Sequence, residues 1–510
     1  MSLSLVHSRA LLGLQAKPVV VEVHLANGLP SFTLVGLADT EVKEARERVR
    51  SAIQNSGLEF PGNKRITVNL APADLPKDSG RFDLPIALGI LAASGQLDAS
   101  KLAGYEFAGE LSLGGELRPV RGALAMSLAL ASEAGSQRAQ LVLPEGSAQE
   151  AALVPDVRIY RALHLLDVAK QFLPGDVPPE ADDGWVRVAT TDTPGEAHYP
   201  DLADVKGQAA AKRALEIAAA GGHSLLLMGA PGSGKSMLAQ RFAGLLPAMT
   251  TQEALESAAI ASLGGRFSLD RWAVRPTCSP HHTASAVALV GGGSPPRPGE
   301  ISLAHCGVLF LDELPEFPRA ALEALREPLE TGCITIARAA QRAEFPAHFQ
   351  LIAAMNPCPC GYLGSSLRAC RCSPEQVARY QGKLSGPLID RIDLHVEVGA
   401  LAAHELINAA PGEGTASIRQ RVVAARDRAV SRQGRANQAL EGQAIDAQCQ
   451  LNAAAATCLN TAASRLGWSG RSIHRCLKVA RTIADLAGAA QVDVGHVAEA
   501  VQYRRALKGL

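Results

Sequence analysis

Short apolar runs recur through the middle of the chain, each followed by glycine or by polar residues. Residues 224–228, 308–311 and 349–355 are such runs, and each has the length and character of a buried strand. The first leads into a glycine-rich loop and then into the amphipathic stretch 237–242, in the order strand, loop, helix. This pattern predicts an α/β core built on a parallel sheet.

The regions on either side of this core have different patterns. Residues 1–171 alternate short β-branched strands with helices, and the stretch 84–93 is apolar enough to be a buried helix. Residues 172–200 combine proline, glycine and acidic residues, which is typical of an exposed linker. We place the core at 201–400, and the alanine-rich remainder at 401–510 is predicted to be a helical domain.

Charge and composition narrow the possible partners. The 510 residues carry 50 lysines plus arginines and 50 acidic residues, so contact with nucleic acid has to come from local arginine clusters. No apolar run approaches the ~18 residues of a membrane span, and the start of the chain lacks the pattern of an export signal. We expect a cytoplasmic protein without membrane contact, whose ten cysteines are reduced thiols or metal ligands.

The glycine-rich loop has the sequence Gly-Ala-Pro-Gly-Ser-Gly-Lys-Ser, which fits the G-x-x-x-x-G-K-[ST] phosphate-loop pattern. Its glycines let backbone N–H groups point at a phosphate chain near the positive end of the following helix. Lys235 is placed to reach the β- and γ-phosphates of ATP, and Ser236 to bind Mg²⁺. The alternative is a glycine-rich turn without a ligand. The predicted ATP-binding residues are Gly229, Ala230, Pro231, Gly232, Ser233, Gly234, Lys235 and Ser236.

The other two apolar runs end in groups that suit ATP hydrolysis. Asp312 and Glu313 follow one strand, and Asn356 follows the other. Asp312 is placed to hold Mg²⁺, and Glu313 to orient and polarise the attacking water. Asn356 would be a polar sensor near the γ-phosphate. A strand that ends in two acids is common by itself, but together with the phosphate loop these strand ends predict an ATPase site.

Two C-x-C pairs, separated by nine residues, follow the third strand. Four thiolates in such a cluster suit a tetrahedral structural Zn²⁺, although C-x₂-C is the more usual spacing. The alternative is a set of reduced cysteines without metal. His281 and His282 are interpreted as loop-packing or hydrogen-bonding residues rather than metal ligands. The candidate zinc ligands are Cys358, Cys360, Cys370 and Cys372.

Residues 76–85 and 109–122 resemble two signature segments of the Lon protease domain. The family's catalytic serine falls at Arg81 and its lysine near Leu124; Ser79 is a nearby hydroxyl without a lysine to activate it. The resemblance implies a Lon-like (ribosomal-S5-like) α+β domain without peptidase chemistry, serving assembly or polynucleotide contact.

Residues 201–208 resemble the D-V-x-G-Q box that lies against adenine in AAA+ ATPases. Six further segments resemble the YifB/ComM branch of magnesium-chelatase-like AAA+ proteins. They are residues 280–283, 291–305, 310–317, 353–361, 384–396 and 477–486. The resemblance implies an AAA+ P-loop ATPase core with a C-terminal helical lid. It also implies a homo-hexameric ring that acts on single-stranded and branched DNA, as a helicase that promotes branch migration in natural transformation. The alternative use of such a core is to remodel a protein partner or to assist metal insertion, as chelatase motor subunits do.

The same resemblance assigns roles to several arginines. Arg391 lies where AAA+ rings carry the arginine finger that reaches a neighbour's γ-phosphate, and Arg471 matches the second sensor arginine, with Arg475 as the fallback. Residues 334–345 read as a hairpin that projects into the central pore of related motors. The alternative is an ordinary hairpin with solvated arginines. Candidate DNA contacts are Arg338, Arg342 and, with weaker support, Arg297.

Overall fold

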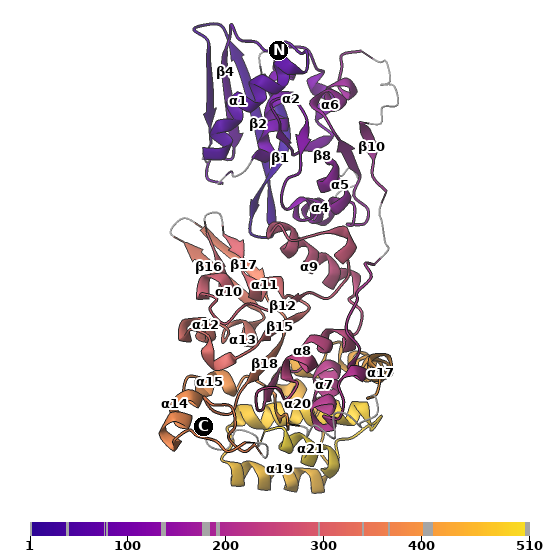
Figure 1. The fold of residues 1–510 in the computed structure, drawn as a ribbon. Coiled ribbons are helices and arrows are strands. Elements are labelled where there is room, and N and C mark those ends of the chain that lie inside the picture. Colours follow the sequence, from indigo (N-terminus) through magenta and orange to yellow (C-terminus); the bar gives the residue numbers. More distant parts are fainter. Residues whose placement is uncertain are drawn as a thin grey trace.

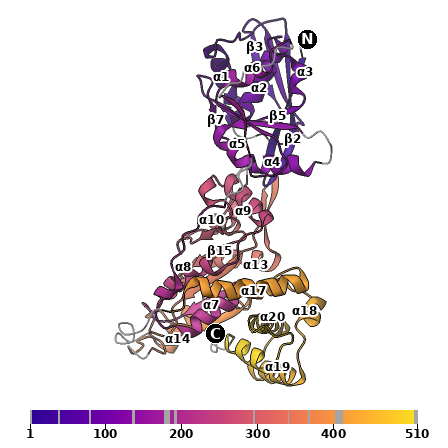
Figure 2. The same ribbon diagram turned by 90° about the vertical axis from the view of Figure 1, so that its right-hand side faces the viewer.

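The computed structural model describes residues 3–36, 40–75, 77, 80–133, 139–175, 184–189, 194–293, 296–338, 341–365, 368–400 and 412–504. Three regions follow one another along an elongated molecule (Figure 1). The N-terminal region forms one end, the α/β core lies in the middle, and the C-terminal helices pack beside the far end of the core (Figure 2). No helix among the described residues is long and apolar enough to cross a membrane.

The N-terminal region is built on an eight-stranded mixed sheet in the order β10-β9-β8-β5-β1-β2-β4-β3. Helix α2 is buried along its whole length against β1 and β2, as its uninterrupted apolar sequence predicts. The strands of this sheet are β1 (Leu3–Leu12), β2 (Gln15–Ala26), β3 (Ser31–Val35), β4 (Arg65–Ala71), β5 (Tyr105–Phe107), β8 (Gln140–Pro144), β9 (Ile159–Ala162) and β10 (Trp185–Arg187). Strands β6 (Glu110–Leu111) and β7 (Leu117–Arg118) pair with each other in a separate two-stranded sheet. The helices are α1 (Thr40–Asn55), η1 (Gly80–Phe82), α2 (Asp83–Ala93), α3 (Ala99–Leu102), α4 (Ala123–Ser132), α5 (Glu145–Ala151) and α6 (Leu165–Gln171).

Strand β10 lies inside the stretch that the sequence predicts to be a linker. It pairs antiparallel with β9, with Trp185 opposite Ala162, and so forms an edge of the N-terminal sheet. The Trp185 ring stacks on Tyr160 at a centroid distance of 5.0 Å. An aromatic ring that packs on the neighbouring strand holds this short strand to the domain. Because prolines and acidic residues surround this strand, the local composition predicts a linker rather than a strand.

The core is a five-stranded parallel sheet in the order β12-β15-β18-β11-β19, as predicted. Its strands are β11 (Leu225–Met228), β12 (Thr277–Cys278), β15 (Val308–Leu311), β18 (Gln350–Met355) and β19 (Leu394–Glu397). Leu225 and Leu227 pack into one apolar cluster and Leu226 and Met228 into another, so both faces of β11 are covered. The remaining elements of the core are η2 (Leu202–Asp204), α7 (Ala209–Gly221), α8 (Lys235–Phe242), η3 (Ala243–Leu245), α9 (Thr251–Leu263), η4 (Leu269–Arg271), α10 (Ala286–Val290), β13 (Gly291–Gly292), β14 (Arg297–Pro298), α11 (Glu300–Leu303), η5 (Leu314–Glu316), α12 (Arg319–Ala324), α13 (Pro328–Thr331), β16 (Cys333–Arg338), β17 (Gln341–Pro346), α14 (Pro374–Gln381) and α15 (Gly386–Ile389).

The C-terminal region is helical, as predicted: α17 (Thr415–Gln433), η6 (Asn437–Ala439), α18 (Gln443–Gln448), α19 (Ala453–Leu466), α20 (Gly470–Leu486) and α21 (Val494–Gln502). Most arginines of α17 bind the protein itself, since Arg421, Arg426, Arg428 and Arg432 donate to carboxylates or backbone carbonyls, whereas Arg419 is exposed. Arg426 donates to the carbonyls of Ala219 and Ala220, and Arg432 pairs with Asp485 on α20 at 2.6 Å. These bonds attach α17 to the end of α7 and to α20.

The N-terminal region touches the core at two places. Leu124 of α4 shares an apolar cluster with Ala254 and Ala258 of α9. The turn between β1 and β2 reaches the β16–β17 hairpin: a Cβ placed on Gly13 would lie 3.3 Å from that of Ala343. The hairpin itself is present where the sequence predicts it. The two regions are therefore in contact both through α9 and through the hairpin that is the candidate pore element (Figure 1).

Candidate nucleotide site

The phosphate loop connects β11 to α8, as the sequence predicts. Its conformation needs glycine at two positions, because Gly232 and Gly234 have φ values of +77° and +93°. Gly234 is also the N-cap of helix α8, which starts at Lys235. The free backbone N–H groups at the start of this helix therefore face the loop, where they suit an anion.

Lys235 is buried and turned back onto the loop. Its Nζ donates to the carbonyls of Gly229 (2.8 Å) and Ala230 (3.0 Å) and to Oδ1 of Asn356 (3.1 Å). Burial lowers the pKa of Lys235, while the neighbouring charges of Asp312 and Glu313 act in the opposite direction. The structure thus brings the predicted lysine and the predicted sensor asparagine together from two neighbouring strands.

Ser236 and Asp312 also meet. The Ser236 hydroxyl donates to Oδ2 of Asp312 at 2.6 Å, and the backbone N–H of Glu313 donates to the other carboxylate oxygen at 2.9 Å. Asp312 follows β15 and Ser236 begins α8, so the carboxyl edge of the sheet positions both. A hydroxyl and a carboxylate are hard oxygen ligands, which is the donor set that Mg²⁺ prefers. These two residues therefore fit the expected ion.

Glu313 adopts a left-handed backbone conformation, with φ of +53°, directly after its strand. Its carboxylate lies 3.1 Å from Nδ1 of His282 and is about half exposed. Sequence reasoning gave His282 a hydrogen-bonding or packing role but missed its partner. One signal was available: β12 ends at Cys278 and is the neighbour of β15, so a residue shortly after β12 reaches the same edge of the sheet.

The segment that resembles the adenine box lies beside the phosphate loop. The side-chain amide of Gln208 donates to the carbonyl of Ser233 at 3.1 Å and to that of Gly399 at 2.6 Å. It therefore joins the loop to the segment after β19. Asp201, at the start of the box, accepts a hydrogen bond from the backbone of Thr415 at 2.8 Å, which ties the same segment to α17.

The predicted finger arginine, Arg391, and the predicted second sensor arginine, Arg471, lie together at the other end of the sheet. Arg391 donates to the carboxylate of Glu330 and to the carbonyl of Pro387 (2.8 Å), and Arg471 lies 3.3 Å from the same carboxylate. Arg391 precedes β19, whose first residue pairs with the first residue of β11. The phosphate loop follows the last residue of β11, so these arginines face away from their own chain's loop.

The fallback arginine has a structural role. Nη1 of Arg475 donates to the carbonyl of Arg391 (2.7 Å) and to a carboxylate oxygen of Asp393 (2.6 Å). Asp393 is buried; burial opposes its ionisation, but Arg475 and His223 hold its pKa below the usual value. Arg475 therefore fixes the segment that carries Arg391, while Arg471 remains mostly exposed.

The four candidate zinc ligands converge, as the sequence predicts. Sγ of Cys358 lies 3.5 Å from that of Cys360 and 3.6 Å from that of Cys370, and all four sulfurs lie within 4.8 Å of one another. A tetrahedral Zn²⁺ with Zn–S bonds of ~2.3 Å needs sulfurs a little under ~4 Å apart, so these residues fit the ion. The loop also approaches the phosphate loop, because a Cβ on Gly361 would lie 2.5 Å from Cδ of Pro231.

The candidate DNA contacts are not part of the nucleotide site. Arg342 is exposed on β17, and Arg297 is exposed on the short strand β14. Arg338 ends β16, opposite Gln341, but its side chain lies outside the described residues. The hairpin projects from the core toward the N-terminal region (Figure 1).

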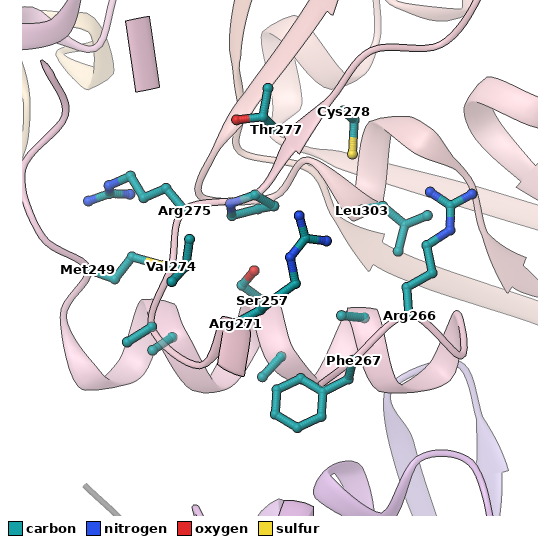
Figure 3. Close-up of a pocket in the computed structure, with 15 residues that line it drawn as sticks. Met249, Ser257, Arg266, Phe267, Arg271, Val274, Arg275, Thr277, Cys278 and Leu303 are labelled. Atoms are coloured by element: carbon teal, nitrogen blue, oxygen red, sulfur yellow. The ribbon is translucent and has the colours of Figure 1, made fainter. Parts of the chain in front are cut away.

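A separate cavity of about 130 Å³ lies between α9 and the segment before β12 (Figure 3). Three arginines line it, and two of these are already engaged. Arg266 pairs with Glu300 at 2.7 Å, and Arg275 donates to the carbonyls of Pro247 and Cys306. None of the phosphate-loop residues is among its lining residues. We assign it no part in nucleotide binding.

Three family models match consecutive parts of the chain. The model for magnesium chelatase, subunit ChlI, matches residues 201–406. A model for subunit ChlI of Mg-chelatase matches residues 21–147, and one for the C-terminal part of subunit ChlI matches residues 412–504. The nucleotide site described above lies within the first of these matches.

Full-length relatives show the same relationship. The chain is 51% identical to competence protein ComM of Haemophilus influenzae over 99% of this chain and 98% of that one. It is 50% identical to protein YifB of Escherichia coli over 99% and 97% of the two chains. It is 42% identical to protein Rv2897c of Mycobacterium tuberculosis over 99% of each. Identity at this level along the entire length establishes the family, so the chain belongs to the magnesium-chelatase-like AAA+ proteins of the YifB/ComM family.

Proposed function

We propose that this protein is an ATP-driven ring motor, or helicase, that moves along DNA and promotes branch migration during natural transformation. The observation that carries the proposal is the division of the site between the two edges of one sheet. Lys235, Ser236 and Asp312 meet at the carboxyl edge, while Arg391 and Arg471 lie at the amino edge. A homo-hexameric ring, in which each copy presents its amino edge to the next copy's phosphate loop, completes six such sites.

At the carboxyl edge, the backbone of residues 229–236 holds the phosphate chain of ATP, and Lys235 exchanges its loop carbonyls for phosphate oxygens. Ser236 and Asp312 hold Mg²⁺, which supplies positive charge against the phosphates when bound. Glu313 accepts a proton from the attacking water, with His282 orienting its carboxylate. Asn356, already bonded to Lys235, reports the state of the γ-phosphate to the strand that carries it.

At the amino edge, Arg391 leaves Glu330 to meet the neighbour's γ-phosphate, and Arg471 acts beside it as the second sensor. Arginine in this role is worth ~10³ to 10⁵ in rate in related phosphoryl-transfer enzymes. The C-terminal helices carry Arg471 on α20 and act as the lid of the ring site. Each copy thereby binds ATP beside the arginines of one neighbour and supplies its own arginines to the ATP of the other neighbour.

DNA contact is assigned to the β16–β17 hairpin, where Arg342 and Arg338 meet phosphates without reading bases; Arg297 on β14 is a secondary candidate. A competence protein among the close relatives supports DNA as the substrate. The proposed partners are single-stranded and branched DNA, and the proposed location is the cytoplasm. The four cysteines hold a structural Zn²⁺ that fixes the loop between Asn356 and the phosphate loop.

We assign the N-terminal region, residues 1–171 with β10, a Lon-like fold without peptidase activity. Arg81, at the position of the family's serine, is buried, and Leu124, near that of the lysine, is buried in α4. Ser79 lies outside the described residues. An arginine and a leucine cannot act as the nucleophile and the base at these two positions, so assembly or polynucleotide contact is the proposed task of this region.

The second candidate function is remodelling of a protein partner, or chelatase-like metal insertion. It is favoured by one observation, the match of residues 201–406 to a magnesium chelatase subunit. The nucleotide chemistry is the same in both cases, so only the response to DNA separates them.

The test is the ATPase rate measured alone, with single-stranded DNA and with forked DNA, followed by strand displacement on the fork. The motor proposal expects stimulation by DNA and displacement that requires ATP. Glu313→Gln is expected to bind ATP and form rings but to lose hydrolysis by at least ~10². An ATPase rate that no DNA structure changes, with no displacement, would leave the protein-remodelling alternative.

A further inference from the structure

A groove lies at the free edge of the N-terminal sheet, far from the nucleotide site. Strand β3 ends the sheet, and the groove runs between its start, one face of α1 and the chain that enters β4. Its volume is about 270 Å³, near the lower end of the ~300–1,000 Å³ range of ligand pockets. Figure 1 shows α1 and β4 on the same side of the elongated molecule as the β16–β17 hairpin.

Two aromatic rings form part of the groove. Phe32 of β3 and Phe60, before β4, lie with their ring centroids 6.3 Å apart and tilted by 35°. Both are partly exposed rather than fully buried. The guanidinium of Arg50 lies 5.8 Å from the centroid of Phe60. Only 4% of the chain is aromatic, so a partly exposed pair with a cation beside it is unusual here.

The charges of the groove are mainly positive. Arg46 and Arg50 are four residues apart on α1 and therefore share a helix face, and Lys64 lies opposite them. Glu47 is the single acid among the lining residues and pairs with Arg46 at 3.3 Å. Lys64 donates to the uncharged side chain of Asn27 at 2.6 Å. Within the described residues, Arg50 has no carboxylate partner, so its charge is available to a ligand.

We propose that this groove binds single-stranded DNA, with an unstacked base against Phe60 and Phe32 and the flanking phosphates on Arg50, Arg46 and Lys64. Aromatic faces with cations alongside are the combination that holds single strands without reading sequence. A duplex keeps its bases stacked and offers none to the rings. The groove is thus a second DNA site, separate from the hairpin, and it goes beyond the proposed motor because it needs neither ATP nor a ring.

The test is fluorescence anisotropy of the full-length protein with a labelled oligo-dT strand, without nucleotide, across a range of salt concentrations. The variants are made both in the wild type and in an Arg342→Glu background. In the Arg342→Glu background, the hairpin should contribute little to DNA binding. Arg50→Ala is expected to weaken binding about fivefold and to reduce the slope of log K against log salt by ~0.7, the value for one phosphate of a single strand. Phe60→Ala is expected to weaken it about tenfold.

The matched control is Arg187→Ala, an exposed arginine on β10, the opposite edge strand of the same sheet. It is expected to bind like the wild type. Phe60→Ala removes a ring that packs on the core, so its melting temperature is measured as well. Arg50 is exposed and its replacement leaves the fold intact, which keeps the test decisive if Phe60→Ala fails to fold.

Unchanged affinity and salt slope in Arg50→Ala would overturn the proposal, and so would an equal loss in Arg187→Ala. Duplex DNA or polyglutamate that competes as well as oligo-dT at equal charge would also overturn it, because the groove would then be only an electrostatic surface. Failure of the motor proposal gives a different result: DNA would not stimulate ATP hydrolysis, while the anisotropy differences between these variants would persist.

Discussion

The carboxyl and amino edges of the core sheet carry different kinds of polar group. At the carboxyl edge, a lysine, a serine, an asparagine and the carboxylate of Asp312 are bonded to one another or to the phosphate loop, and the carboxylate of Glu313 pairs with His282. At the amino edge, two arginines share the single carboxylate of Glu330, and the buried Nε of Arg391 has no partner among the described residues. The carboxyl edge is arranged to bind a charged ligand, and the amino edge carries arginines whose positive charge is only partly neutralised by Glu330.

This difference between the two edges is the reason for proposing that a single copy is incomplete. The strands of β11 and β19 run in the same direction and in register, so no local movement brings Arg391 to the loop after β11. In the proposed ring, transition-state charge on the γ-phosphate would therefore be met by another copy. Experiments that move or remove groups at one edge, while the other stays intact, test this division.

The largest effect is expected from Arg391→Ala. Turnover of the assembled ring should fall by about 10³ or more, with ATP affinity close to that of the wild type, because the loop that binds ATP belongs to the other edge. Steady-state ATPase rates and binding of a fluorescent nucleotide analogue measure the two quantities. Arg465→Ala, which changes an exposed arginine on α19, serves as the matched control.

Mixed rings give a sharper form of the same experiment. Lys235→Ala should not bind ATP, and Arg391→Ala should bind it without turnover, so each is inactive alone. Mixed in equal amounts, about a quarter of the interfaces would join an intact loop to an intact finger, and activity should return in that proportion. If the mixture stays inactive while mixed rings form, the arginine does not act across the interface.

A smaller effect is expected from His282→Ala at the carboxyl edge. Loss of the contact with Glu313 should lower kcat about tenfold and leave KM nearly unchanged, because the histidine orients the carboxylate without touching ATP. His281→Ala is the control, since its ring packs on His282 and its Nδ1 bonds Thr283 instead. His282→Gln should recover part of the rate. Equal losses in both alanine variants would assign the histidines to loop packing alone.

The smallest effect on turnover is expected from Cys370→Ser. When purified without chelator, this variant should contain no zinc and should unfold at a lower temperature than the wild type. It should also hydrolyse ATP about threefold more slowly, because Gly361 then supports Pro231 less firmly. Elemental analysis, thermal melting and the ATPase rate measure these changes. Cys458→Ser on α19 is the control. A wild-type protein without bound metal would contradict the zinc site.

The carboxyl edge could be predicted from the sequence because each of its groups follows a recognisable apolar strand. Parallel strands end at a common edge, so Lys235, Asp312 and Asn356 meet whatever the lengths of the connections. His282 has no such strand before it, since β12 is two residues long and carries little signal. Its contact with Glu313 depends on which strands are neighbours, which the sequence does not state.

The amino edge was harder to predict for a related reason. The family pattern identified Arg391 and Arg471, but Glu330, which holds both, lies on the four-residue helix α13 in no recognised motif. The contacts of Arg426 and Arg432 on α17 have no signal in the sequence, because their partners are backbone carbonyls and an acid on other helices. Strand β10 was missed because a three-residue strand is held by packing rather than by its own pattern.

The β1–β2 turn rests on β17, where a Cβ placed on Gly13 would lie in tight contact, 3.3 Å, with that of Ala343. If the hairpin shifts during ATP hydrolysis, the β1–β2 turn must either move with it or slide over it. Strands β1 and β2, which the turn connects, belong to the sheet that ends at β3. A displacement of the hairpin would therefore tilt the N-terminal region. A movement of the hairpin, the proposed DNA contact, would in this way be transmitted to the far end of the molecule.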